Sequence, residues 1–118
     1  MLFEMNGCNW YIQEASQKQI KEELVTRYKK GMEDEPENGV YFGITYHDMN
    51  CILLDKDLPE DRKKKTLYHE LTHCYIGSYI THCSKTYTEE DVCDILSNSH
   101  DIIHKIVKDY FMVDNDKK

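Results

Sequence analysis

The run His-Glu-Leu-Thr-His at positions 69–73 has the clearest chemical meaning in this chain. No glycine or proline interrupts residues 60–76, so we expect a helix here. Residues four apart lie on one face of a helix, and His69 and His73 can therefore direct two imidazole nitrogens at one metal ion. Glu70 lies beside them, where its carboxylate can accept a proton from metal-bound water. The pattern predicts the active-site helix of a zinc hydrolase, with both histidines as ligands and Glu70 as general base.

A catalytic zinc ion usually has three protein ligands and a water molecule, so a third ligand must come from another element. Thr88 is expected to cap a later helix, with Asp91 three residues on as a variant of the capping box. Acidic residues gather at the start of that helix: Glu89, Glu90, Asp91 and Asp94. Acids in a first turn also complement the helix dipole, so their presence alone does not identify a ligand.

Spacing helps to choose among these acids. Glu90 and Asp94 share a helix face, so one can bind the metal while the other accepts a hydrogen bond from a ligand histidine. Glu89 lies on the same face as two apolar residues and can also point inward. We favour Glu90 as the third zinc ligand and Asp94 as the carboxylate that supports a histidine, with Glu89 as the alternative ligand.

His69-Glu70-x-x-His73 followed by Glu90-x-x-x-Asp94 resembles the gluzincins, the thermolysin-like zinc metallopeptidases. The small size is similar to that of the minigluzincins and the ImmA/IrrE-type metallopeptidases, and the resemblance covers about residues 40–96. In many ImmA/IrrE proteins the ligand glutamate is followed by a helix that leads into a leucine-proline segment. Residues 92–97 of this chain lack that ending. The resemblance implies that Zn²⁺ is the cofactor, that a peptide or protein is the substrate, and that a repressor or regulator is a plausible target.

The elements that must position these residues can be outlined from local patterns. Residues 3–12, with an Asn-Gly turn signal, favour a small hairpin or one bent strand, and a helix capped by Ser16 should run to about Lys30. Residues 40–46 alternate strictly and predict a strand, paired as an antiparallel hairpin with residues 51–54. The motif helix should begin at 57–59 and end near Gly77 or Ile80. The last helix should follow a loop at 81–87, with a break at 97–99 and frayed residues from 114.

These elements predict an α+β fold in one domain spanning residues 1–118. We expect a small zincin-like domain, in which a short sheet containing antiparallel strands packs against the active-site helix and a C-terminal glutamate helix. By analogy with zincins, an exposed edge strand would bind the substrate backbone. The sequence leaves open whether that edge is the strand at 40–46 or the strand at 51–54.

Composition narrows the class of partner. The formal net charge of −7 argues against a nucleic-acid partner, which would require a basic face. We find neither a signal peptide nor a run approaching the ~18 apolar residues of a membrane span, so we expect a cytoplasmic protein with no membrane contact. The five cysteines are irregularly spaced and are expected to be reduced.

Other side chains are candidate donors to the oxyanion that peptide hydrolysis forms. They are Tyr79, His82, Tyr87, His100 and His104. His100 and His104 are four apart and can in principle form a second metal pair, but an exposed polar helix face is the simpler interpretation. His47 falls in a hairpin turn and is expected to be solvated.

The leading hypothesis for function is a zinc-dependent metalloendopeptidase acting on a protein substrate. One alternative is a non-proteolytic zinc-binding module, such as a toxin or an inhibitor that keeps the site. Another is a different zinc amide hydrolase.

Overall fold

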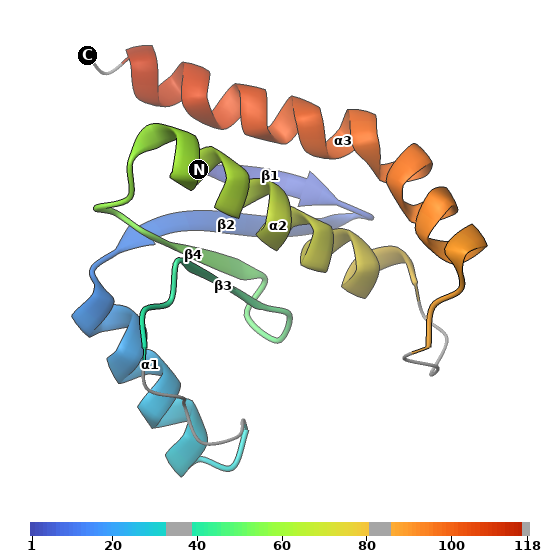
Figure 1. Ribbon diagram of the computed structural model, residues 1–118. Helices are drawn as coiled ribbons and strands as arrows, with labels where there is room; N and C mark the ends of the chain where they lie inside the picture. Colours follow the sequence, from blue (N-terminus) through green and yellow to red (C-terminus); the bar gives the residue numbers. More distant parts are fainter. Residues whose placement is uncertain (33–38, 81–85, 117–118) are drawn as a thin grey trace.

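The computed structural model describes residues 1–32, 39–80 and 86–116 of the 118-residue chain (Figure 1). The chain begins with β1 (Leu2–Met5) and β2 (Cys8–Ala15), which pair as antiparallel strands. Asn6 and Gly7 join them with φ angles of 50° and 79°, the positive values that a two-residue type I′ turn requires. Of the two alternatives for residues 3–12, the hairpin is therefore the one that forms, and its second strand extends to Ala15.

Helix α1 (Gln17–Lys29) begins at the serine that the sequence indicated. The Ser16 hydroxyl accepts a hydrogen bond from the backbone nitrogen of Gln19, and the Gln19 side chain accepts one from the Ser16 nitrogen. This capping box satisfies two amide groups that a helix start otherwise leaves unpaired. Ile20 and Leu24 form the buried stripe of α1.

Strands β3 (Gly43–Tyr46) and β4 (Cys51–Asp55) form the expected antiparallel hairpin. The sheet has the order β1-β2-β4-β3, with β2 and β4 parallel, so β3 is an outer strand and β4 an inner one. The strand expected from residue 40 begins only at Gly43. The reason is a side chain, because Gln17 donates to the Tyr41 carbonyl at 2.7 Å and accepts from the Tyr41 nitrogen at 3.2 Å.

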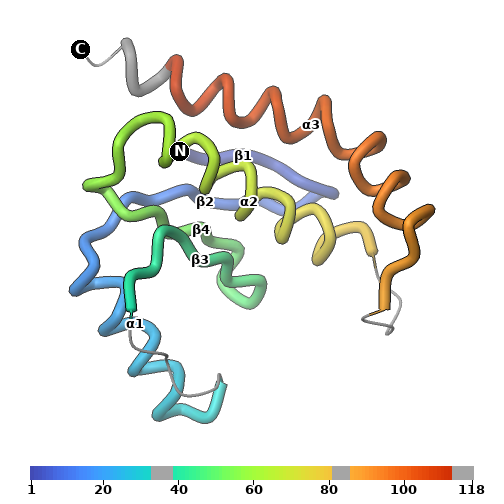
Figure 2. The backbone as a smooth tube through the Cα atoms, in the orientation of Figure 1, coloured from blue at the N-terminus to red at the C-terminus, as the bar shows by residue number. Residues whose placement is uncertain are grey.

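Helices α2 (Glu60–Tyr79) and α3 (Glu89–Asp116) lie side by side, apart from α1 (Figures 1 and 2). Helix α2 packs on the sheet, and α3 packs on α2. The buried residues between these layers come from strands and helices alike: Phe3, Met5, Trp10, Ile12, Ile52, Leu54, Leu67, Leu71, Cys74, Ile103, Ile106 and Val107. The predicted α+β class, with a sheet packed against the motif helix, is confirmed.

The C-terminal helix differs from the expectation in two ways. It does not break at residues 97–99, and it continues to Asp116, past residue 114, from which fraying was expected. The Ser97 hydroxyl bonds back to the Cys93 carbonyl at 2.8 Å, and Ser99 is buried in the helix interface. Both serines are therefore accommodated inside the helix, although they are weak helix formers. Residues 81–85 of the expected loop lie outside the described residues.

In the described ranges, no helix combines the length and the apolar character that crossing a membrane requires. Four cysteines in these ranges are free thiols: Cys8, Cys51, Cys74 and Cys93. Cys83 lies outside the described residues.

Candidate active site

The side chains of the two motif histidines converge on one point at the exposed surface of α2. Both side chains are exposed, and their Nε2 atoms lie 3.3 Å apart, with ring planes at 76°. Two zinc–nitrogen bonds of ~2.0–2.1 Å at a tetrahedral angle place their nitrogens about 3.3 Å apart. The spacing of His69 and His73 therefore fits a pair of zinc ligands.

Glu70 is held at the inner side of this pair. The residue is only 6% exposed, and its Oε2 atom lies 3.9 Å from Nε2 of His69. The Thr45 hydroxyl of β3 lies 2.8 Å from Oε1 and 3.1 Å from the Glu70 carbonyl oxygen, and donates to these two acceptors. One carboxylate oxygen is thus occupied by the sheet, and the other faces the histidines.

Gly43 allows the edge strand to approach α2 this closely. A Cβ atom at this position would lie 2.9 Å from Cγ2 of Thr66 and 3.1 Å from Cγ of Glu70. Sequence reasoning singled out neither Gly43 nor Thr45. The available signal was a glycine inside a strictly alternating strand, which often marks a close backbone approach.

A cleft of about 340 Å³ opens beside this site, between α2 and the segment that leads into β3. Its lining comes from both elements: Val40, Tyr41, Phe42, Gly43, Lys65, Thr66, His69 and Glu70. Val40 is 64% exposed and Phe42 is 40% exposed, so apolar side chains border the cleft next to the candidate base. The cleft is large enough to receive a side chain of an extended peptide.

The ring of His47 has neighbours from other elements. Its ring meets Trp10 edge to face at a centroid distance of 5.6 Å, and a Cβ atom added to Gly77 would lie 2.2 Å from its Cε1. Burial, followed by the nearby His73, lowers the pKa of His47 below its ordinary value of 6.5, against a smaller opposing effect of Asp48. His47 is exposed, as expected of a turn residue, and one side of its ring packs against Trp10.

The acids of α3 occupy different surroundings. Thr88 and Asp91 form the predicted reciprocal cap, with nitrogen-to-oxygen distances of 3.0 and 3.1 Å. Glu89 and Glu90 are exposed.

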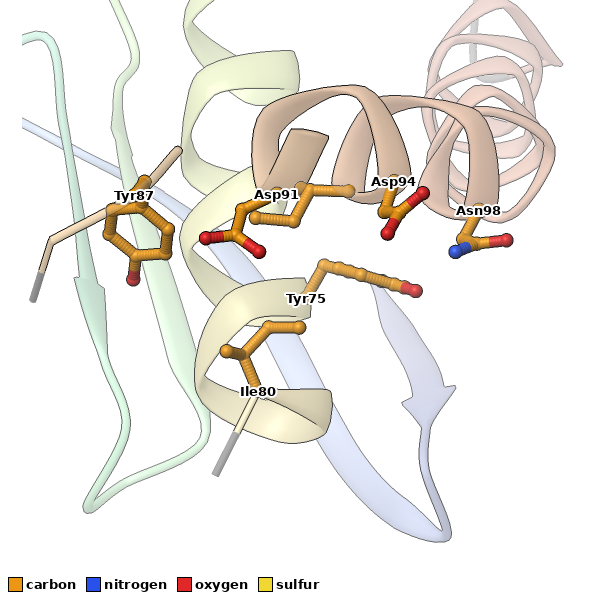
Figure 3. A pocket seen from close by; sticks show the side chains of 7 residues that line it. Tyr75, Ile80, Tyr87, Asp91, Asp94 and Asn98 are labelled. Atoms are coloured by element: carbon orange, nitrogen blue, oxygen red, sulfur yellow. The ribbon is translucent and has the colours of Figure 1, made fainter. Parts of the chain in front are cut away.

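Asp94 borders a small cavity of about 140 Å³ together with Tyr75 and Tyr87 (Figure 3). Within residues 1–32, 39–80 and 86–116, no three His, Cys, Asp or Glu side chains are grouped as a metal site, so the third ligand stays a prediction.

A family model described as the IrrE N-terminal-like domain, of peptidase family M78, matches residues 13–104. The match includes β3, the motif helix and the first half of α3. The chain belongs to this family. No curated protein and no solved structure shows a significant match. Family membership makes this chain a metallopeptidase-like domain, and such a domain implies a metal, usually zinc.

In this IrrE N-terminal-like domain, several of the expected oxyanion donors are engaged elsewhere. The Tyr79 hydroxyl accepts a hydrogen bond from the Asn6 nitrogen at 3.0 Å, which ties the end of α2 to the β1–β2 turn. His104 is 2.8 Å from the Tyr68 hydroxyl, across the interface between α2 and α3. His100 stacks on His104 at a centroid distance of 5.9 Å. His82 lies outside the described residues, and Tyr87 lines the small cavity of Figure 3.

Proposed function

We propose that this protein is a zinc-dependent metalloendopeptidase that hydrolyses a peptide bond in a protein substrate. The observation that carries the proposal is the fixed arrangement of two histidine nitrogens 3.3 Å apart with a buried carboxylate beside them. We assign His69, His73 and Glu90 as the zinc ligands, with Glu89 as the alternative third ligand and Asp94 as a supporting carboxylate. A regulator or repressor in the cytoplasm is the proposed kind of substrate.

Zinc bound at the histidine pair would lower the pKa of its water toward ~7 and polarise the substrate carbonyl. Glu70 would accept the proton of that water and pass it to the leaving nitrogen of the peptide. The proton would move on Oε2, because Oε1 is the atom that Thr45 holds and Oε2 is the atom that faces His69. When Glu70 carries the proton, the Thr45 hydroxyl can still donate to the Glu70 carbonyl oxygen at 3.1 Å.

The substrate would bind as an added strand along β3. Only β3 can serve among the two strands that the sequence left open, because β4 is paired on both sides. The Phe42 carbonyl accepts from the Asp55 nitrogen at 2.9 Å, so Phe42, Ile44 and Tyr46 direct their backbone groups toward β4. Gly43 and Thr45 direct theirs to the open edge, where an extended peptide can pair with them.

The test uses the purified protein loaded with one equivalent of Zn²⁺ and a mixture of quenched fluorescent peptides of random sequence. We expect peptide-bond cleavage that is lost in Glu70→Gln, while both proteins keep their zinc. Glu14→Gln is the control, because the Glu14 carboxylate binds Lys63 and Tyr110, which lie outside residues 69–73. If the wild-type protein bound zinc but cleaved none of the peptides, the non-proteolytic zinc module would replace this proposal.

A further inference from the structure

Thr45 is the one residue of the open edge strand whose side chain bonds to the candidate general base. Its hydroxyl reaches both the carboxylate and the carbonyl oxygen of Glu70, at 2.8 and 3.1 Å. The carboxylate belongs to a residue that is 6% exposed, where water competes little for the hydrogen bond. A hydrogen bond to an ionised carboxylate is stronger than a neutral one.

The same residue faces the proposed substrate with its backbone. The pairing of Phe42 with Asp55 leaves the amide and carbonyl of Thr45 directed away from β4, toward the open edge. Thr45 therefore belongs to two sets of contacts at once. Its main chain lies where a substrate strand would pair, and its side chain fixes the carboxylate that would take the proton.

Resting on the proposed function, we infer that Thr45 is a positioning residue that sets the register between the substrate strand and Glu70. A peptide paired with the Thr45 backbone is placed at a fixed offset from Oε2, because one side chain connects the two. Gly43 also directs its backbone groups to the open edge and supports this arrangement. Because it lacks a Cβ atom, β3 can come within reach of Glu70.

The experiment compares variants that differ only in the hydroxyl. Thr45→Val keeps the shape and removes the hydrogen bond, and Thr45→Ser keeps the hydroxyl. Thr72→Val is the matched control. Thr72 lies on α2, the helix of Glu70, and its hydroxyl bonds back to the Tyr68 carbonyl at 2.8 Å. Each protein is loaded with Co²⁺, and acetohydroxamate binding is followed through the cobalt absorption bands. This probe carries a proton that a correctly placed carboxylate can accept in a charge-assisted hydrogen bond.

We expect Thr45→Val to bind acetohydroxamate about 10–100-fold more weakly than wild type, the loss that removing a hydrogen bond to a charged group predicts. Thr45→Ser and Thr72→Val should stay within about threefold of wild type, all with one equivalent of cobalt. Unchanged affinity in folded Thr45→Val overturns the inference, and so does weak binding in folded, cobalt-loaded Thr45→Ser. A Glu70→Gln protein is measured in parallel, because its result tests the assignment of Glu70 as the base separately from the role of Thr45. If it binds as tightly as wild type, the base assignment itself fails.

Discussion

Replacing Gly43 with alanine tests the close approach of β3 to the motif helix. The added methyl group would sit 2.9 Å from Thr66 Cγ2, 3.1 Å from Glu70 Cγ and 3.2 Å from the Leu53 carbonyl oxygen. Thr66 and Glu70 are 9% and 6% exposed, and the third neighbour is backbone, so none of them can move aside easily. Overpacking of this kind costs ~1–3 kcal/mol. Gly43 has extended backbone angles, so the cost is steric and not conformational.

The assay is equilibrium unfolding in urea. With an m-value of about 1.5 kcal/mol per M, we expect the midpoint to fall by about 0.7–2 M. Gly77→Ala is the control, because the three atoms nearest its methyl group would all belong to the ring of His47, which lies in an exposed turn and can swing away. Alanine also favours a helix over glycine by ~1 kcal/mol, so this variant should be as stable as wild type or more so. A Gly43→Ala protein with the wild-type midpoint and wild-type acetohydroxamate affinity would refute the reasoning.

Three other predictions follow from single residues. Glu90→Ala should lower zinc affinity measured by chelator competition by about tenfold or more, and Glu89→Ala should not; the reverse result would make Glu89 the ligand. The hydrogen bond from Arg27 lowers the pKa of Asp48 below its usual 3.8, so the stabilisation that it gives is present at pH 7 and is lost as the pH falls through the folded-state pKa. Asp48→Asn should therefore be less stable than wild type at pH 7, and the difference in urea midpoints should shrink as the pH falls through the folded-state pKa. Burial raises the pKa of the Cys74 thiol strongly, so Cys74 should resist a disulfide reagent at pH 8 until the protein unfolds, whereas the exposed thiols react at once.

The sequence predicted the local elements well, because each carries its own signal. Ser16 and Thr88 cap their helices with their own side chains, and Asn6-Gly7 specifies its turn through positive φ angles. The spacing of His69 and His73 follows from helix geometry alone. These features depend on residues a few positions apart, and a reader of the chain can recover them without the fold.

The features that the sequence did not reveal depend on contacts between distant segments. Thr45 lies 25 positions before Glu70, and nothing in its neighbourhood indicates which carboxylate it will bind. The start of β3 was misplaced because Gln17, 24 positions away, takes over the backbone groups of Tyr41. The packing of the His47 ring against Trp10 likewise joins residues of different elements. Local patterns carry no record of such pairings.

The parallel pairing of β2 with β4 has a consequence for how the protein folds. The two hairpins, β1–β2 and β3–β4, are local and can form early, but joining them requires closure of the long connection that contains α1. Such non-local pairing is slow relative to hairpin or helix formation. Helix α2 packs across this junction, since it contacts β1 as well as β3 and β4. The contacts of α2 with β1 should therefore form only after the two hairpins have joined, in the slowest phase of folding.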